Sequence, residues 1–309
     1  MSTHTIMGAG GVIGRELARI LPAYADHIRL VSRHPEKVNA TDELLAADLT
    51  DAPSVAAAVK GSDVVYLTAG LPYRLGVWQR DWPRIMTNVI DACILHQAAL
   101  IFFDNIYCYG RVDGPITEQS PMAPSSGKGK VRVGLTRMLE EAWQSRGLRG
   151  AIVRAADFYG KGADNSIFHA LVLGKFKEGK KAQWLCDDRV RYTMTYTPDA
   201  ALGTAMIGHN PDTWQQVWHL PTSTEELSSG DLITMAAELA AMPSRRTLLK
   251  KNMLRVAGLF DKTVHEMVEM AYQYQYDYIF DSGKFVRYFN LSATPYQQGL
   301  RDVLGVTEA

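Results

Sequence analysis

The chain has few cysteines, and their spacing does not suggest a structural role. Its 309 residues include three cysteines, Cys93, Cys108 and Cys186, an odd number without a paired pattern. Neither a disulfide framework nor a cysteine-ligated zinc site is therefore expected, and a cytoplasmic location fits this composition. The eight histidines also lack the spacing of a metal site, so no bound metal ion is expected.

Long apolar runs and an excess of one charge are also missing. No window reaches the roughly 18–20 consecutive apolar residues that a membrane-spanning helix needs, and no basic segment of an export signal precedes the first apolar run. The 33 basic residues balance 33 acidic ones, so no overall field favours nucleic acid or an anionic membrane surface. The expected partner is a small molecule, and neither nucleic acid nor a membrane is expected.

Short apolar runs alternate with amphipathic stretches over about the first 155 residues. Strands are predicted at 4–7, 27–31, 64–69, 99–103 and 150–153, with helices at 14–21, 54–60, 82–96 and 130–146. This alternation is typical of a parallel sheet covered by helices on both faces. It ends after residue 160. The predicted fold is therefore α/β, with a Rossmann-type doubly wound sheet in residues 1–160 and a smaller, mixed substrate-binding region in residues 161–309.

A glycine-rich turn follows the first predicted strand directly and opens a helix. Glycines at such a turn let the backbone approach a pyrophosphate, whose charge then meets free amide N–H groups and the positive end of the helix dipole. In this strand–turn–helix context the pattern predicts dinucleotide binding. The expected contacts come from Gly8, Gly10, Gly11, Val12, Ile13 and Gly14.

The end of the second predicted strand favours one of the two nicotinamide dinucleotides. An NAD enzyme places Asp or Glu there to bind the ribose hydroxyls, whereas this chain has Ser32 and Arg33. A guanidinium can pair with a 2′-phosphate, so NADP(H) is predicted over NAD(H), with Ser32 assisting Arg33. The alternative is a solvated arginine on a loop. Further cofactor contacts are expected from Asp48, Leu49, Thr68, Ala69 and Gly70.

Several further segments carry a resemblance to a known family. They are 88–93, Ile106-Tyr-Cys-Tyr-Gly110, the Thr-Glu and proline stretch of 117–124, 154–160 and 196–200. With the glycine spacing of the first turn, the chain resembles the extended or atypical short-chain dehydrogenase/reductases, which include NAD(P)-dependent sugar-nucleotide epimerases and dehydratases. The resemblance implies that residues of about 190–207 return to the nucleotide domain. It also leaves open a homodimer formed through the helix at 130–146.

The catalytic pattern of this family, Tyr-x-x-x-Lys with a serine upstream, is incomplete here. Counted from the matching segments, the serine position falls on Asn105, and the tyrosine and lysine positions fall on Lys128 and Arg132. A shift of two residues would instead bring in Lys130. Neither register supplies a tyrosine, so the family's usual proton donor is missing.

A replacement acid or base must come from elsewhere. Asn105 can still hold a carbonyl or hydroxyl, and Arg132 can hold the nicotinamide ribose or an anionic substrate but cannot act as a base. The nearest candidates along the chain are Tyr107, Lys128 and Asp104, of which Tyr107 is preferred. The alternatives are a Tyr107 ring packed beneath the cofactor, a Lys128 that is solvated or binds cofactor phosphates, and an Asp104 in a turn or helix cap.

Two functions remain open at this point. The first is an NADP(H)-linked oxidoreductase or epimerase/dehydratase-like enzyme acting on a small polar substrate, a sugar nucleotide or a carbonyl compound. The second is a non-catalytic NADP(H) sensor of the NmrA-like kind. Loss of the tyrosine favours the sensor, whereas the substrate region, including residues 196–200, favours a retained small-molecule pocket.

Overall fold

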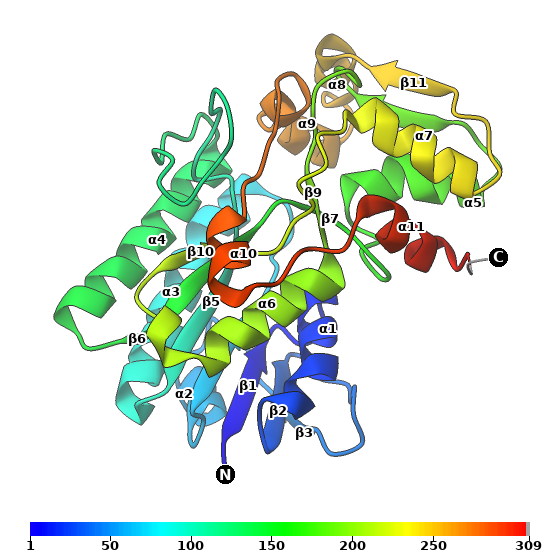
Figure 1. Ribbon diagram of the computed structural model, residues 1–309. Helices are drawn as coiled ribbons and strands as arrows, with labels where there is room; N and C mark the ends of the chain where they lie inside the picture. Colours follow the sequence, from blue (N-terminus) through cyan, green and yellow to red (C-terminus); the bar gives the residue numbers. More distant parts are fainter. Residues whose placement is uncertain (307–309) are drawn as a thin grey trace.

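A seven-stranded parallel sheet forms the centre of the molecule (Figure 1). The computed structural model describes residues 1–306, apart from the side chain of Thr263. The strands lie in the order β10-β6-β5-β4-β1-β2-β3. Their bounds are β1 Thr3–Met7, β2 His27–Ser32, β3 Glu43–Ala46, β4 Val64–Leu67, β5 Ala99–Asn105, β6 Arg149–Ala155 and β10 Val217–His219.

Burial along the strands follows their place in the sheet. Every residue of the central strand β4 is buried, as expected for a parallel strand covered on both faces. The edge strand β3 has no buried residue. The order of strands reverses between β1 and β4, and in open α/β sheets ligands bind outside the carboxyl ends of the strands at such a switch point.

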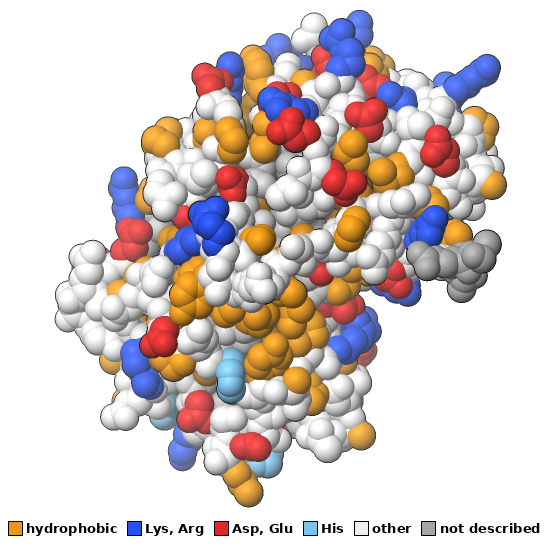
Figure 2. All heavy atoms as spheres, in the orientation of Figure 1, with side chains coloured by type: hydrophobic (Ala, Val, Ile, Leu, Met, Phe, Trp, Pro, Cys, Tyr) orange, Lys and Arg blue, Asp and Glu red, His pale blue; other side chains and the backbone are white. Residues whose placement is uncertain are grey.

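Helices cover both faces of the sheet (Figure 1). On one face, α1, α6 and α10 share a core with residues such as Leu17, Ala201 and Phe285, and on the other α2, α3 and α4 share a second core that includes Val55, Trp82 and Leu139. Their bounds are α1 Val12–Ile20, α2 Ala52–Val59, α3 Leu75–His96, α4 Gly127–Ser145, α6 Thr197–His209 and α10 Gly283–Phe289. Figure 2 shows apolar side chains gathered over α6.

A third core lies beyond the carboxyl ends of the strands, mainly in the C-terminal region that is predicted to bind substrate and is called the substrate region below. It contains two two-stranded parallel sheets, β7 with β9 and β8 with β11. The strands are β7 Asp157–Tyr159, β8 Ala182–Leu185, β9 Met194–Tyr196 and β11 Arg246–Leu249, and the helices are α5 Gly174–Lys177, α7 Ser229–Leu239, α8 Lys251–Ala257, α9 Lys262–Val268 and α11 Tyr296–Leu304.

The structure confirms the predicted fold class and differs from the sequence analysis in three places. The third helix begins at Leu75 rather than at residue 82, with Pro83 inside it. The return to the nucleotide domain extends beyond residue 207, because α6 is followed by β10, which pairs with β6. The edge strand β3 was not among the predicted strands. Within the described residues, no helix is both long enough and apolar enough to cross a membrane.

Candidate functional site

The predicted phosphate loop is a tight turn pressed against the end of β4. Gly8 has a φ of +98°, and a Cβ atom there would lie 2.5 Å from the backbone nitrogen of Ala69. A Cβ on Gly14 would lie 2.7 Å from the carbonyl oxygen of Gly8. Distances below 3 Å are not tolerated against backbone, so both positions require glycine. The turn therefore brings β1, β4 and the start of α1 into close contact.

The other side of this turn is open. A Cβ on Gly10 would meet nothing within 4 Å, and a Cβ on Gly11 would make only an ordinary contact at 3.5 Å. Gly11 is also the N-cap of α1, and no side chain of residues 1–306 caps this helix end. The first amides, including those of Val12 and Ile13, can therefore be capped by a diphosphate, whose charge the helix dipole favours. The residues present fit the predicted dinucleotide.

At the end of β2 lie Ser32 and Arg33, the two residues predicted to bind the 2′-phosphate. The Ser32 hydroxyl is buried without a hydrogen bond, and the Arg33 side chain is exposed and makes no ion pair with the residues that the structure describes. Asp48 lies close by, where hydrogen bonds from Thr50 and, to a lesser degree, the charge of Arg33 lower the pKa of its carboxyl. The guanidinium is thus available to a phosphate. The 2′-phosphate contact remains a prediction.

Helix α4 turns inward the two residues that the resemblance aligns with the family's catalytic tyrosine and lysine. The Ser126 hydroxyl caps its N-terminus by accepting from the Gly129 amide at 3.0 Å. Lys128 and Arg132, one turn apart, are both buried, whereas Lys130 is exposed. Burial thus separates Lys128 and Arg132 from Lys130, while the alignment of these residues with the family's tyrosine and lysine stays a prediction.

Lys128 is held by two carboxylates from the substrate region. Its ammonium contacts Oε2 of Glu266, lies 2.8 Å from Oε1 of Glu269 and sits 4.4 Å from the centre of the Tyr73 ring. The same carboxylates accept from the amides of Leu75 and Gly127, which open α3 and α4. Burial opposes ionisation of Glu266, but hydrogen bonds from Lys128 and the Leu75 amide lower its pKa. Lys128 is therefore not solvated, because its ammonium is buried and paired with two carboxylates of the chain itself.

Arg132 belongs to a buried charge network. Its Nη1 lies 3.3 Å from Oδ1 of Asp104, and Oδ2 of Asp104 accepts from Nε of Arg154 at 3.2 Å. The Arg132 guanidinium lies over the rings of Trp82 and Trp78, 4.2 and 4.5 Å from their centres. Asp104 is thus a buried counter-ion between two arginines, and the turn or helix-cap interpretation is wrong. Both tryptophans belong to α3 and are buried in the core that this helix shares with the sheet.

Asn105 and Tyr107 lie at the carboxyl end of β5. The Asn105 side-chain oxygen accepts from the Tyr107 amide at 3.0 Å, and the Tyr107 ring stacks on Trp78 with 6.2 Å between ring centres. Burial, with the charge of Asp157 adding to it, raises the pKa of Tyr107 well above its ordinary value, while a hydrogen bond from Tyr73 and the charge of Arg132 act in the opposite direction. The phenol therefore keeps its proton at neutral pH.

Residues of the substrate region that the sequence analysis missed also face this site. The Asp157 carboxylate accepts hydrogen bonds from the hydroxyls of Tyr192 and Tyr274, the latter at 3.0 Å. Burial raises the pKa of Asp157, although these two hydrogen bonds oppose the shift. Asp157 falls within the 154–160 segment that carried part of the resemblance, so a signal for it existed. Glu266 had no local signal.

The first two thirds of the chain match a known protein family by sequence. Residues 4–219 match the sequence model of the NAD dependent epimerase/dehydratase family. The chain belongs to this family. No curated protein sequence matches the chain.

Solved structures of this epimerase/dehydratase type have the same fold over nearly the whole chain. UDP-glucuronic acid 4-epimerase from Bacillus cereus, in complex with NAD, is 17% identical with a TM-score of 0.79, covering 98% of both chains. The dTDP-glucose 4,6-dehydratase DesIV from Streptomyces venezuelae, with NAD bound, is 16% identical with a TM-score of 0.80, covering 98% of this chain and 96% of the other. UDP-glucose 4-epimerase from Thermus thermophilus, also with NAD, is 16% identical with a TM-score of 0.79, covering 98% of both. At these identities the likeness shows the fold.

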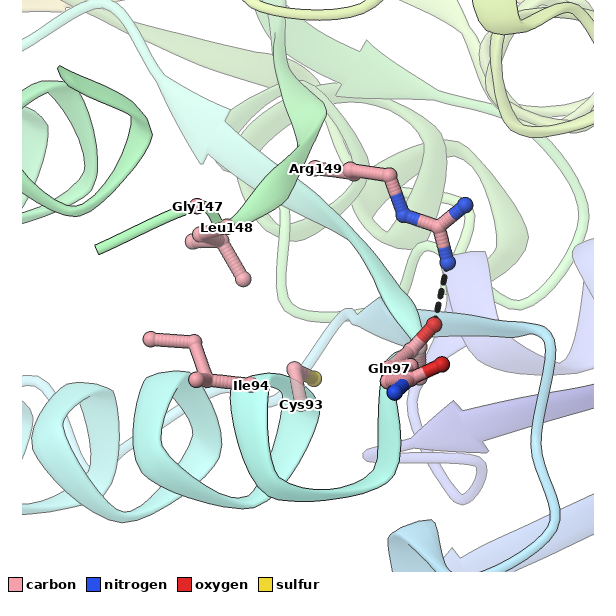
Figure 3. A pocket seen from close by; sticks show the side chains of 7 residues that line it. Cys93, Ile94, Gln97, Gly147, Leu148 and Arg149 are labelled. Atoms are coloured by element: carbon pink, nitrogen blue, oxygen red, sulfur yellow. Dashed lines mark hydrogen bonds between the residues drawn. The ribbon is translucent and has the colours of Figure 1, made fainter. Parts of the chain in front are cut away.

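One cavity of this epimerase/dehydratase family member lies far from these residues. It has a volume of about 210 Å³ and lies between the end of α3 and the start of β6, lined by residues that include Cys93, Gln97 and Arg149 (Figure 3). This is the edge where β5 and β6 begin, opposite the carboxyl ends of the strands where the glycine turn lies. The cavity is therefore not part of the candidate dinucleotide site.

Proposed function

We propose that the protein is an NADP(H)-linked oxidoreductase or epimerase/dehydratase-like enzyme acting on a small polar substrate, either a sugar nucleotide or a carbonyl compound. Membership of the epimerase/dehydratase family supports the class of activity. The proposal also assigns Tyr107 the role of the family's missing tyrosine.

The observation that carries this assignment is the position of Tyr107. It lies two residues beyond Asn105 at the carboxyl end of β5, and the charge of Arg132 acts on its phenol. Lys128 occupies the family's tyrosine position but is neutralised by Glu266 and Glu269. Of the three residues considered as replacement acids, Tyr107 is therefore the one that is neither ion-paired nor used as a counter-ion.

The raised pKa of Tyr107 favours proton donation over proton abstraction. The dinucleotide, when bound, would supply a hydride to the substrate carbonyl carbon, and the resulting alkoxide is a stronger base than a phenolate. The Tyr107 hydroxyl would give its proton to that oxygen, leaving an alcohol, and the phenolate would regain a proton from solvent. Asn105 would orient the oxygen, and the buried cation of Arg132 would stabilise the transient phenolate.

The preference for NADP(H) within this proposal depends on Arg33. A guanidinium without an internal ion pair at the end of β2 offers a bidentate partner to a 2′-phosphate, and the orphaned Ser32 hydroxyl offers another hydrogen bond. No carboxylate stands at these two positions to bind the ribose diol of NAD(H).

A second function, an NmrA-like sensor without turnover, is favoured by the Lys128 cluster. Carboxylates of the chain itself bind Lys128, the residue that the resemblance aligns with the catalytic tyrosine, and cap the amides of Leu75 and Gly127. Such a protein would bind NADPH and NADP⁺ with different affinities and report the difference to a partner.

The two functions are distinguished by incubating the purified protein with NADPH and a panel of sugar nucleotides, ketones and aldehydes. Nicotinamide absorbance is followed, and products are identified directly because an epimerase cycle leaves no net change in absorbance. Turnover that is lost in Tyr107→Phe supports the enzyme. Absence of any product, combined with different affinities for NADPH and NADP⁺, supports the sensor.

A further inference from the structure

Large apolar side chains are exposed together on one short segment of the substrate region. Met253 is 51% exposed, Val256 60%, Leu259 77% and Phe260 89%. Exposure of single apolar residues is ordinary, but four within eight positions of one short segment concentrate apolar surface there, and they are called the patch below. This segment lies at the end of the molecule opposite the N-terminus (Figure 1).

The patch is the outer side of a tight helical hairpin made by α8 and α9. Leu254 and Gly258 face inward and are buried, so Met253 and Val256 point outward. A Cβ on Gly258 would lie 2.9 Å from Cα of His265, which shows how closely the two helices approach. Leu259 and Phe260 form the turn between them. The tip is therefore a convex apolar wedge on a well-packed base.

Positive charge surrounds this wedge. Residues 245–262 contain six basic side chains, of which Arg246 is ion-paired with Asp188, and the other five are Arg245, Lys250, Lys251, Arg255 and Lys262. The single acidic residue in this range, Asp261, accepts from the Val264 amide at the start of α9. Among the described residues, Lys250 and Arg255 are exposed and take part in no ion pair. The chain as a whole carries no net charge, but this part of its surface is locally basic.

We propose that the α8–α9 hairpin docks reversibly on an anionic phospholipid bilayer. Apolar side chains at the tip would enter the boundary between headgroups and acyl chains, and the flanking cations would pair with lipid phosphates. A convex wedge suits a deformable surface, whereas a protein partner would need a matching groove. The sequence analysis predicted no membrane partner because it considered only the net charge of the chain. The net charge does not reveal that basic residues are grouped around this hairpin.

Docking would place the candidate site close to the lipid surface. Glu266 follows on α9 and contacts Lys128 at the start of α4, so the hairpin is tied to the nucleotide domain on its inner side. The wedge itself contains none of the proposed cofactor or catalytic residues. The inference therefore stands independently of the proposed reaction.

Co-sedimentation of the full chain with vesicles tests the proposal. Vesicles of phosphatidylcholine alone are compared with vesicles that also contain phosphatidylglycerol, at low and at high salt. We expect binding to the phosphatidylglycerol vesicles, weakened by salt. The double variant Leu259→Ser/Phe260→Ser should bind about tenfold more weakly, as should Lys250→Ser/Arg255→Ser. Leu95→Ser, at a site 68% exposed on α3, is the matched control and should bind as the parent does.

Three results would overturn the proposal. They are no binding to the phosphatidylglycerol vesicles, equal binding of the wedge and control variants, and loss of a dimer in the wedge variant without any change in lipid binding. The last result would identify the patch as an interface between copies of the chain. Circular dichroism and thermal stabilisation by NADPH verify that each variant is folded.

Discussion

The Nζ atom of Lys128 lies 2.8 Å from Oε1 of Glu269, a residue 141 positions further along the chain. Because this ammonium is fully buried while Glu266 and Glu269 are only 20% and 26% exposed, its removal leaves two carboxylates with poor hydration. We expect Lys128→Met to lower the free energy of unfolding by about 2 kcal/mol. This loss is smaller than for breaking a fully buried ion pair, because the two carboxylates are partly hydrated. Urea denaturation measures this change.

Lys130→Met is the control for that variant, since Lys130 is exposed on the same helix. It should change the free energy of unfolding by less than about 0.5 kcal/mol. Equal losses in the two variants would mean that the contacts between Lys128 and its carboxylates contribute nothing to stability.

Removing one hydroxyl tests the assignment of the proton donor. Tyr107→Phe keeps the ring on Trp78 and should lower kcat about a hundredfold, with little change in KM or in the unfolding midpoint. Tyr276→Phe, at an exposed tyrosine of the substrate region, should leave kcat as it is. A Tyr107→Phe enzyme with full kcat would transfer the role to another group.

The cofactor preference is tested at the end of β2. Arg33→Ala should raise the Kd for NADPH at least roughly tenfold, because a charge-assisted pair with the 2′-phosphate is lost, and should leave the Kd for NADH unchanged. Isothermal titration calorimetry provides both constants. His34→Ala, the exposed neighbour, is the control. Equal effects of Arg33→Ala on both cofactors would contradict a contact to the 2′-phosphate.

The buried His219 should make stability depend on pH. Its ring lies between the Tyr109 hydroxyl, 2.9 Å from Nε2, and the Asp281 carbonyl, 2.8 Å from Nδ1. Burial lowers the pKa of His219 to about 3, although the hydrogen bond with Asp281 opposes the shift. The unfolded chain binds a proton below about pH 6.5 and the native state does not, so this contribution is complete above pH 6.5 and is lost as the pH falls toward 3.

Below pH 6.5, this residue should lower the free energy of unfolding by about 1.4 kcal/mol per pH unit. In His219→Gln, the free energy of unfolding should fall less steeply between pH 6.5 and 4.5 than in the parent. The difference between the two slopes should be this amount. Equilibrium unfolding in urea at a series of pH values measures it, with the exposed His34→Gln as a comparison. Parallel curves for parent and His219→Gln would show that His219 is already protonated in the native state.

Local patterns predicted much of the nucleotide domain, because its strands are continuous apolar runs and its helices are amphipathic. They failed where the signal was short or ambiguous. The three residues of β10 give too little periodicity to stand out, and Pro83 resembles a helix start because it lacks an N–H, although here it lies inside α3.

The residues of the candidate site were also predicted only in part. Lys128 and Arg132 were singled out by the family resemblance, by counting from the matching segments, and the structure buries both side chains. Glu266 and Glu269 were not predicted, because their partners lie 138 and 141 positions away and no pattern in a single sequence records such a pairing. Long-range charge neutralisation is visible only after folding.

The pairing of β10 with β6 has a consequence for the order in which the molecule can be assembled. A nascent chain that has left the ribosome only as far as residue 160 lacks both this outermost strand and α6, which covers Leu17 and Ala18 of α1. The apolar surface that α6 covers would therefore be exposed to water until residue 219 has been synthesised. A truncated chain that ends after β6 should therefore aggregate rather than fold as an independent dinucleotide-binding domain.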